Sequence, residues 1–447
     1  MSNRARLSIA VIGAGISGLS AAWLLGTRHD VTLYEQADRI GGHSNTVRAK
    51  LCEGEVPVDT GFIVFNRRTY PNFAALLAHL NVASERSDMS FSASLDNGAF
   101  EYAAGTASGL LAQPRNLVAR RYWTMLSEIV RFYRTASHDA GAARLDGRTL
   151  GEYLEREGFS GAFCDDHLLP MAGAIWSSPP DAMRDWPAEA FIRFHANHGL
   201  LQFFGRPVWE TVKGGSIGYV RAMLERFRGY VLRDRAATRV ERRDDLVTVR
   251  DSRGACRSFD HVVLATHSDQ ALALLARPSR PEEALLGAIP YRRNLAVLHT
   301  DSRFMPRRRA AWASWNYAGR RGDTRPQFTY WMNRLQRLGA TTNIFVTLNP
   351  HEAPGAGTIL HSESYDHPVF DTAALTAQRR LWELQGRNRT WFCGAWFGAG
   401  FHEDGLQAGL AVAEQLGGTR RPWRVSDESG RIHISPAAAP APFEAVS

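Results

Sequence analysis

The chain has 447 residues, of which 44% are hydrophobic and 22% are charged, a composition that excludes a wholly disordered protein. Its length exceeds one ordinary hydrophobic core, so we expect two domains or one large composite domain. The formal net charge is +8, yet there is no run of five basic residues and no recognised nucleic-acid-binding module, which argues against a nucleic-acid partner.

The four cysteines lie far apart in the sequence, which predicts free thiols and no zinc or thiol redox motif. The basic excess is almost entirely arginine, because lysine occurs only at positions 50 and 213. Genomic base bias is one explanation of this excess, and an anionic membrane surface or an acidic ligand is another.

The most apolar stretch, residues 6–26, begins at arginines, as a secretion signal would. Glycines at positions 13, 15 and 18 interrupt it, and it continues into the β-branched segment 30–35 rather than into a small-residue cleavage site. These features predict a buried strand at 8–12, a tight turn, a helix at 17–25 and a second parallel strand. They argue against a leader peptide or a membrane anchor.

Each glycine of the turn has a physical task in a dinucleotide site. Gly13 permits the sharp turn, Gly15 lets the backbone approach a pyrophosphate, and Gly18 lets helix and strand pack closely. The start of the helix, with Ile16 and Ser17, offers unpaired N–H groups to the phosphates.

An acidic residue ends the second strand about 20 residues further on, where a ribose hydroxyl is expected. This residue is Glu35, followed by Gln36, and the segment Arg39-Ile-Gly41-Gly42-His43 adds a second glycine pair that can approach the phosphates. Together with the first turn, these residues resemble the FAD-binding N-terminus of the flavin amine oxidase and phytoene desaturase superfamily. NAD dehydrogenases with the same first turn usually lack the Arg-x-Gly-Gly continuation, so the resemblance implies FAD as the cofactor.

Later segments resemble the same superfamily in order, over roughly residues 7–417. Asp59-Thr-Gly61-Phe62 is similar to an Asp-x-Gly turn near the flavin, and 230–232, 237–240 and 246–250 resemble a β-meander that 259–266 closes. Residues 391–394 and 400–409 resemble a strand and a helix whose N-terminus faces the flavin ring. The resemblance implies that the FAD site also includes Gly61, Phe62, Ala237, Gly394, Phe401, His402 and Glu403.

The predicted fold class is α/β, with a Rossmann-type FAD-binding domain and an interleaved α+β substrate domain. We assign 1–75, 205–275 and 388–418 to the FAD-binding domain. Residues 76–204, with mainly helical spacing, and 285–385, with short β-rich runs, form the substrate domain. Flavin ring and substrate are expected to meet between the two. The Ser-, Pro- and Ala-rich segment 422–447 is expected to be a disordered tail.

The helix expected after Phe401 is the candidate for tuning the flavin, because its positive N-terminus would stabilise negative charge on the ring. The side chains of His402 and Glu403 are separate candidates for a catalytic acid or base. Two features depart from the amine oxidases of the superfamily: no lysine follows Lys213, and Phe401 stands where many have a tyrosine. Both favour a dehydrogenase or desaturase with an apolar substrate.

Segments 168–177 and 191–198 concentrate aromatic and polar residues in the second domain. One of them could line the substrate cavity. Alternatively, His195 and His198 are hydrogen-bonded fold residues and Trp176 belongs to the core. No third ligand accompanies the two histidines, so we expect no metal site.

A narrower resemblance involves residues 168–177, 197–201, 206–209 and 400–405. They are similar to a bacterial subgroup that resembles the N-terminal flavoprotein region of plant cyclopropane fatty acid synthases. This resemblance implies dehydrogenation of a methylated or unsaturated phospholipid acyl chain. The alternatives are an amine or amino-acid oxidase, and a flavin-binding partner of a lipid methyltransferase or cyclopropane synthase. We expect a cytoplasmic protein with peripheral contact at the inner membrane face.

Overall fold

The computed structural model describes residues 6–139, 145, 147–176, 179–202, 204–321 and 327–434. One half of the molecule contains a five-stranded parallel sheet in the order β10-β2-β1-β14-β20. Its strands are β1 (Ser8–Ile12), β2 (Asp30–Tyr34), β10 (Gly229–Leu232), β14 (His261–Leu264) and β20 (Thr390–Phe392). The residues of β1, β2 and β14 are nearly all buried, as expected for a parallel sheet covered on both faces. This sheet confirms the predicted α/β class.

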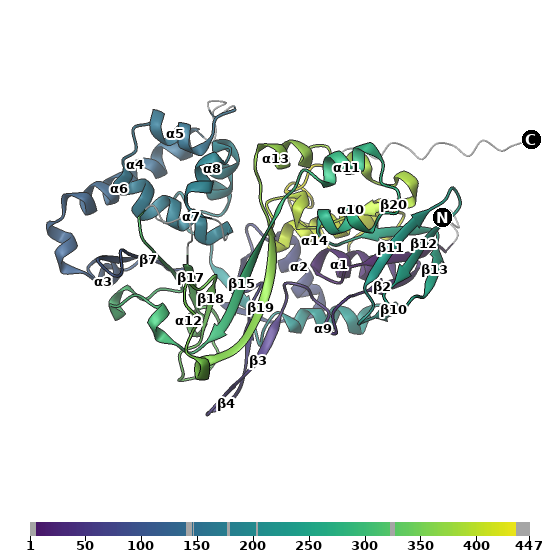
Figure 1. The fold of residues 1–447 in the computed structure, drawn as a ribbon, viewed down its shortest axis with the longest axis horizontal. Coiled ribbons are helices and arrows are strands. Elements are labelled where there is room, and N and C mark those ends of the chain that lie inside the picture. Colours follow the sequence, from purple (N-terminus) through teal and green to yellow (C-terminus); the bar gives the residue numbers. More distant parts are fainter. Residues whose placement is uncertain are drawn as a thin grey trace, which may run out of the picture.

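Two helices from opposite ends of the chain lie side by side against this sheet. They are α1 (Ile16–Leu25), whose residues are all buried, and α14 (His402–Gln415) (Figure 1). Gly405 faces Ile16 and Ser17, whereas Gly409 faces Ser17 and Ser20, one turn further along both helices. The two helices therefore run in the same direction, and their N-termini lie at the same end.

The other half contains a seven-stranded sheet in the order β19-β15-β18-β17-β16-β7-β8. Its strands are β7 (Phe91–Leu95), β8 (Phe100–Ala104), β15 (Tyr291–His299), β16 (Trp315–Gly319), β17 (Gln327–Trp331), β18 (Phe345–Leu348) and β19 (Ile359–Pro368). The segment 76–204 was expected to be mainly helical, and its helices agree with that expectation, which did not include β7 and β8. The signal is present, because apolar residues at 91, 93 and 95 alternate with serines.

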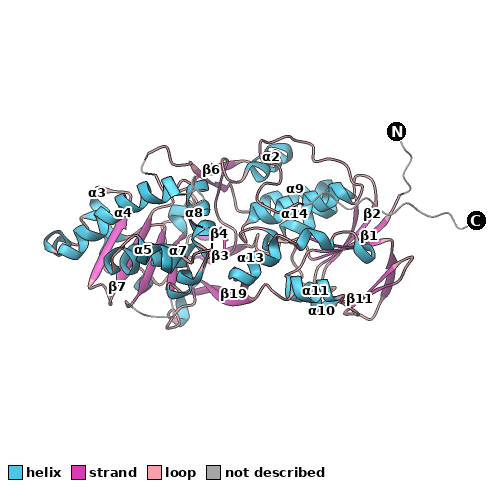
Figure 2. Cartoon of the chain, turned by 90° about the horizontal axis from the view of Figure 1, so that it is seen from above, coloured by secondary structure: helices cyan, strands magenta, loops and turns pink. Residues whose placement is uncertain are grey.

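Helices cover one end of this sheet. They are α4 (Arg120–Asp139), α5 (Leu150–Arg156), α6 (Gly161–Phe163), α7 (Leu169–Trp176) and α8 (Ala188–Asn197). Figure 1 shows this cluster apart from the parallel sheet, with the long strands β15 and β19 between them. Seen from above, α4, α5, α7 and α8 are drawn over the strands of this sheet (Figure 2), and α7 contacts β16.

The β-meander consists of β11 (Ala237–Arg242), β12 (Val247–Asp251) and β13 (Cys256–Phe259). Residues 230–232, expected within it, instead belong to β10, where Gly229 pairs with Val31 of the parallel sheet. Residues 261–264 likewise form β14 of that sheet, and β13 closes the meander. Short β-branched runs of this kind can form a strand of the parallel sheet or of the β-meander. Periodicity alone therefore did not show to which of these two sheets each run belongs.

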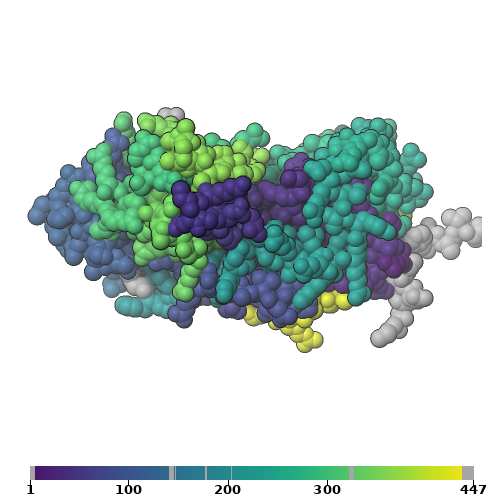
Figure 3. Space-filling view, turned by 90° about the horizontal axis from the view of Figure 1, so that it is seen from below, coloured from purple at the N-terminus to yellow at the C-terminus, as the bar shows by residue number. Residues whose placement is uncertain are grey.

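The remaining elements connect and cover the two halves. They are β3 (Thr46–Leu51), β4 (Gly54–Asp59), β5 (Phe65–Asn66), α2 (Pro71–Leu80), β6 (Ser84–Arg86), α3 (Ala107–Leu110), β9 (Trp209–Val212), α9 (Ile217–Arg226), α10 (Ser268–Leu274), α11 (Arg280–Leu286), α12 (Met332–Leu335) and α13 (Thr372–Gln378). From below, purple N-terminal residues lie on the surface between green and teal segments (Figure 3), so stretches far apart in the sequence meet on one face.

The C-terminal segment differs from the expected disordered tail. Arg431 donates to Asp404 at 2.6 Å, Trp423 stacks on Trp23 with ring centroids 6.1 Å apart, and Ile432 is buried. An ion pair with a buried carboxylate and two apolar contacts thus hold residues 422–434, which composition alone did not indicate. Residues 435–447 lie outside the described residues. In the described ranges, no helix has both the length and the apolar character needed to cross a bilayer.

The close contact between α1 and α14 predicts that one methyl group added at this contact strongly lowers the stability of the protein. A Cβ on Gly409 would lie 2.1 Å from the Ser17 carbonyl oxygen, so Gly409→Ala must push the helices apart. We expect a loss of about 3 kcal/mol in the free energy of unfolding, the upper range for an overpacked core. Urea unfolding measures it. The control is Gly357→Ala, whose Cβ meets no described atom within 4 Å; an equal loss in both variants would contradict the packing argument.

Candidate functional site

Of the three glycines in the turn between β1 and α1, one has open space beside it, at the position where a ligand is expected. Gly13 has φ +96°, and a Cβ there would lie 2.8 Å from the Ala265 carbonyl oxygen. A Cβ on Gly18 would lie 1.9 Å from the Gly13 carbonyl oxygen. A Cβ on Gly15, by contrast, would meet no atom of the described residues within 4 Å. This space at the start of α1, where N–H groups lack helical partners, fits a pyrophosphate.

Glu35 is held beside this turn at the carboxyl end of β2. One carboxylate oxygen accepts a hydrogen bond from the Ala14 N–H at 2.9 Å, and the other accepts one from the Ala37 N–H at 3.0 Å. The carboxylate is only partly buried, so its remaining acceptor capacity can reach a ribose hydroxyl. The neighbouring Gln36 side chain is exposed.

The second glycine pair packs onto the first turn. The Gly41 N–H donates to the Ala14 carbonyl oxygen at 3.0 Å, and a Cβ on Gly42 would lie 3.0 Å from the Gly15 Cα atom. Arg39 fixes this loop by donating to the Gly42 carbonyl oxygen at 2.6 Å. Two separate backbone segments therefore border the space at Gly15, as the sequence predicted.

His43 leads from this loop into the second domain. Its ring contacts Tyr365 and His367 of β19, at centroid distances of 4.9 and 5.5 Å. Burial and the neighbouring His367 hold the pKa of His43 well below its ordinary value, so the ring is neutral. The Phe62 N–H donates to the His43 carbonyl oxygen at 2.7 Å, and a Cβ on Gly61 would lie 2.3 Å from the same oxygen.

Two further predicted residues lie at other edges of the site. Gly394 follows β20, and a Cβ there would lie 2.1 Å from the indole nitrogen of Trp396, which donates to the Thr266 carbonyl oxygen at 3.0 Å. Ala237 begins β11 and is partly buried. The sequence interpretation missed Thr266, although it follows a parallel strand, and ligands bind at the carboxyl ends of such strands.

The N-terminus of α14 lies in the same site as that of α1, because the helices are parallel. Phe401 precedes α14, and its N–H donates to Asp404 at 2.8 Å. The backbone N–H groups of His402 and Glu403 belong to the first helical turn and have no partner within the helix. They can therefore stabilise negative charge placed before them, which requires only backbone.

The side chains of His402 and Glu403 are engaged elsewhere. His402 stacks on Phe62 at 3.8 Å, its Nε2 atom is hydrogen-bonded to the Tyr219 hydroxyl at 2.8 Å, and burial lowers its pKa to about 3. Glu403 accepts hydrogen bonds from the N–H groups of Asn72 and Phe73 in the first turn of α2, at 3.0 and 2.9 Å.

The side-chain amides of Asn72 and Gln407 also donate to Glu403, at 2.9 and 3.0 Å. Both carboxylate oxygens thus cap α2. The acid or base role expected for these two side chains does not fit this arrangement, because neither presents a free titrating group to the site.

The second domain contributes an aromatic wall, which we define as Trp176, Phe194, His198 and Phe401. Phe401 stacks on Phe194 at 5.1 Å and contacts His198 and Trp176 at 5.9 and 6.4 Å. The structure therefore brings together residues 168–176 and 191–198 at the start of α14, and residue 177 of the predicted segment lies outside the described residues. The described residues contain no group of three His, Cys, Asp or Glu side chains that could hold a metal ion.

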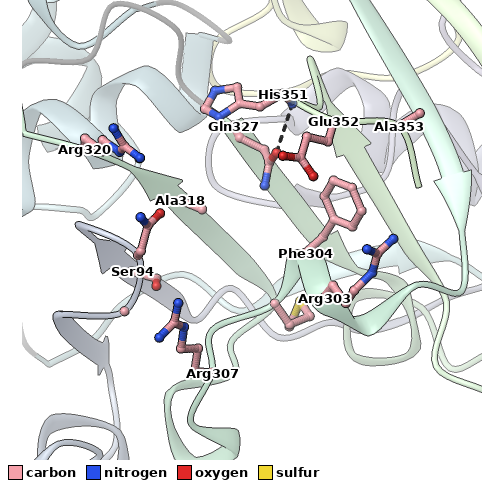
Figure 4. Close-up of a pocket in the computed structure, with 14 residues that line it drawn as sticks. Ser94, Arg303, Phe304, Arg307, Ala318, Arg320, Gln327, His351, Glu352 and Ala353 are labelled. Atoms are coloured by element: carbon pink, nitrogen blue, oxygen red, sulfur yellow. Dashed lines mark hydrogen bonds between the residues drawn. The ribbon is translucent and has the colours of Figure 1, made fainter. Parts of the chain in front are cut away.

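A separate pocket of about 540 Å³ lies at the seven-stranded sheet. Arg303, Arg307 and Arg320 surround it (Figure 4), and Arg303 is paired with Asp301 at 2.6 Å. None of the residues predicted to bind FAD is among the described residues that line this pocket. It is therefore distinct from the site at α1 and α14.

The open space at Gly15 predicts that a side chain there lowers the affinity for FAD without lowering the stability of the FAD-free protein. Gly15 has φ −69°, which alanine adopts freely, so Gly15→Ala should leave the stability of the FAD-free protein within about 0.5 kcal/mol. Its Cβ occupies the space assigned to the pyrophosphate, so FAD affinity should fall about 10- to 100-fold. Calorimetric titration with FAD, alongside urea unfolding, measures both. Unchanged FAD affinity would place the phosphates elsewhere.

A structural role for Glu403 predicts that Glu403→Gln lowers stability. The new amide group would face the N–H donors of α2, which should cost about 1–3 kcal/mol of unfolding free energy. Flavin reduction in the folded protein should change less than about threefold. The control is Glu155→Gln, at an exposed position of α5. Lost flavin reduction with unchanged stability would restore the acid or base assignment.

Comparisons with known proteins extend these observations. The model of the family "Flavin containing amine oxidoreductase" matches residues 16–363. The Mycobacterium tuberculosis protein AofH, named as a flavin-containing monoamine oxidase, is 26% identical over 282 residues, which are 62% of this chain and 60% of AofH. The chain thus spans less than two thirds of that relative. An L-amino-acid oxidase of Bungarus fasciatus is 56% identical over 41 residues, 9% of this chain and 8% of that protein.

Solved structures share the fold at low sequence identity. A CLA-producing fatty acid isomerase from P. acnes has a TM-score of 0.65 at 14% identity, covering 93% of this chain and 99% of the isomerase. Cyclohexylamine oxidase from Brevibacterium oxydans has a TM-score of 0.63 at 17% identity, covering 92% of this chain and all of that one. Because the family model matches well over half of the residues, the chain belongs to the family of flavin-containing amine oxidoreductases, and its cofactor is FAD.

Proposed function

We propose that the protein is an FAD-dependent oxidoreductase that removes two hydrogens from an apolar substrate, such as a methylated or unsaturated phospholipid acyl chain. The observation that carries the proposal is the aromatic wall at the start of α14. Trp176, Phe194 and His198 are buried around Phe401. Burial lowers the pKa of His198 to about 3, so the wall is uncharged at neutral pH.

FAD, when bound, supplies a hydride acceptor. The protein's part is to hold a substrate C–H bond in place, exclude water and stabilise the charge that arrives. The aromatic wall binds apolar chains through buried area, whereas a protonated amine would lose its hydration there. The Asp404 carboxylate, which accepts from the Phe401 N–H, is already paired with Arg431. The first-turn N–H groups of α14 stabilise the negative charge.

Two resemblances support an acyl substrate. Segments 168–177 and 400–405 are similar to flavoproteins linked to acyl-chain modification. The fold is also that of a protein named as a fatty acid isomerase, although at 14% identity this likeness concerns the fold alone. Action together with a lipid methyltransferase or cyclopropane synthase, and peripheral contact with a membrane, stay predictions from the narrower resemblance and from the arginine excess.

Amine oxidation is the second candidate. The similarity to AofH, 26% over 282 residues, and the description of the family favour it. The missing tyrosine hydroxyl at Phe401 and the missing lysine after Lys213 weigh against it.

Anaerobic flavin bleaching distinguishes these candidates. We expect mixed micelles of dioleoyl phosphatidylglycerol to reduce the FAD of the purified holoenzyme, and benzylamine to leave it oxidised, with absorbance near 450 nm as the measurement. Phe194→Ala should slow reduction by the lipid at least about 10-fold, because it removes a large part of the wall. Phe204→Ala, at a side chain that is 88% exposed, is the control. Bleaching by the amine alone would overturn the acyl proposal.

A further inference from the structure

Two histidines at the C-terminal end of α8, His195 within it and His198 directly after it, have a fixed protonation pattern. His195 and His198 are three residues apart and therefore on the same side of the helix. The Nδ1 atom of each lies 2.8 Å from a carbonyl oxygen four residues earlier, that of Phe191 and that of Phe194, respectively. A carbonyl oxygen only accepts, so Nδ1 carries the proton. The Nε2 atom of each neutral ring is then an acceptor with a free lone pair.

Neither Nε2 atom has a hydrogen-bond partner among the described residues. The two side chains are 0% and 3% exposed. Burial lowers their pKa values to about 4 and about 3, so both rings stay neutral at physiological pH. Buried polar atoms are rarely left without a partner, so an unpaired acceptor indicates a missing donor.

The two rings differ in position relative to the aromatic wall. His198 stacks on Phe194 at 3.9 Å and lies 5.9 Å from Phe401, which begins the flavin-facing helix. His195 stacks instead on Phe191 at 4.0 Å; its ring lies 5.7 Å from Phe194 and 6.0 Å from Trp176, and no ring contact joins it to Phe401 among the described residues. Since Nδ1 of His198 donates back to the Phe194 carbonyl oxygen, its Nε2 atom is directed away from that carbonyl, and the ring also lies 6.3 Å from Trp209 and 6.5 Å from Tyr70. Of the two histidines, His198 is therefore the one whose ring contacts Phe401.

We propose that His198 Nε2 accepts a hydrogen bond from a neutral O–H or N–H group of the substrate, so that the substrate is an apolar chain with one uncharged donor. The inference rests on the proposed function, which places the substrate at Phe401. A neutral imidazole acceptor selects a donor without requiring a charge, whereas a plain hydrocarbon leaves the buried lone pair unsatisfied. A hydroxyl and an uncharged nitrogen group are two sources of the same donor chemistry.

The test is binding of small probes to the oxidised holoenzyme. The probes are 1-octanol and its isomer heptyl methyl ether, which has no donor, and octanamide, which supplies a neutral N–H. Perturbation of the flavin absorption band reports binding. We expect 1-octanol to bind about 10-fold more tightly than the ether, the effect of one hydrogen bond to an otherwise unpaired buried group. The response to octanamide distinguishes a nitrogen donor from a hydroxyl.

His198→Asn and His195→Asn form a matched pair. In each variant the asparagine amide can still donate to the carbonyl of α8. The Nε2 acceptor is lost in both, together with one stacked ring contact, that with Phe194 or that with Phe191, so the two variants are matched. His198→Asn should abolish the preference for 1-octanol, and His195→Asn should retain it. In the wild-type protein labelled with [15N]histidine, the Nε2 resonance that is missing from His198→Asn should move with 1-octanol and stay in place with the ether. This readout requires no turnover, and the variant serves only to assign the resonance.

Equal affinity for 1-octanol and the ether in the wild type, or an unmoved His198 resonance, would overturn the inference. Loss of the preference in His195→Asn alone would move the acceptor to the other ring and also overturn it. If neither probe binds while phospholipid still bleaches the flavin, the donor site is absent and the proposed function stands. If neither probe binds and phospholipid leaves the flavin oxidised, both fail.

Discussion

The whole site depends on two parallel helices that touch without large side chains between them. Ser17 of α1 lies against Gly405 and Gly409 of α14, and a Cβ on either glycine would approach Ser17 closer than 3 Å. This contact places both N-termini at the same end. Each N-terminus carries about half a positive charge, so parallel packing is electrostatically unfavourable unless an anion lies before them. A dinucleotide supplies that charge, as phosphate at α1 and as the electron-accepting ring at α14.

The same contact explains how the chain is organised. Because α1 follows the first strand and α14 follows the last, the chain must return to the parallel sheet at its end, and the intervening stretches form the second domain. The strands of that sheet come from 8–34, 229–264 and 390–392. Three residues of the aromatic wall, Trp176, Phe194 and His198, belong to the intervening stretches, and they meet the start of α14 at the fourth, Phe401. Cofactor and substrate surfaces thus come from segments far apart in the sequence.

The sequence was most informative where the backbone geometry of a short segment and the binding of a ligand require the same residue type. Gly13, Gly15 and Gly18 sit where a turn, a ligand and a helix contact each require the absence of a side chain, so their spacing, together with the flanking strands and the acidic residue that ends the second one, indicated the site. The seven-stranded sheet was harder to predict, because β7, which forms a local hairpin with β8, joins the sheet by pairing with β16, more than 200 residues away. Nothing local shows that partner.

The roles of polar side chains were even harder to predict from the sequence than the seven-stranded sheet. His402 and Glu403 carry the right chemistry at the right helix, yet Tyr219 and the start of α2 engage them. Such partners are visible only in three dimensions. The free Nε2 atoms of His195 and His198 were also visible only in three dimensions. The protonation of the two rings follows from helix geometry, and the lack of partners at Nε2 follows from packing.

Calorimetric titration of the FAD-free protein with FAD and with riboflavin tests the central claim most directly. Riboflavin carries the ring but no pyrophosphate. If two helix ends converge on the dinucleotide, FAD should bind at least about 100-fold more tightly than riboflavin, and the difference should shrink as salt screens the helix ends. Equal affinities for the two flavins would contradict the account.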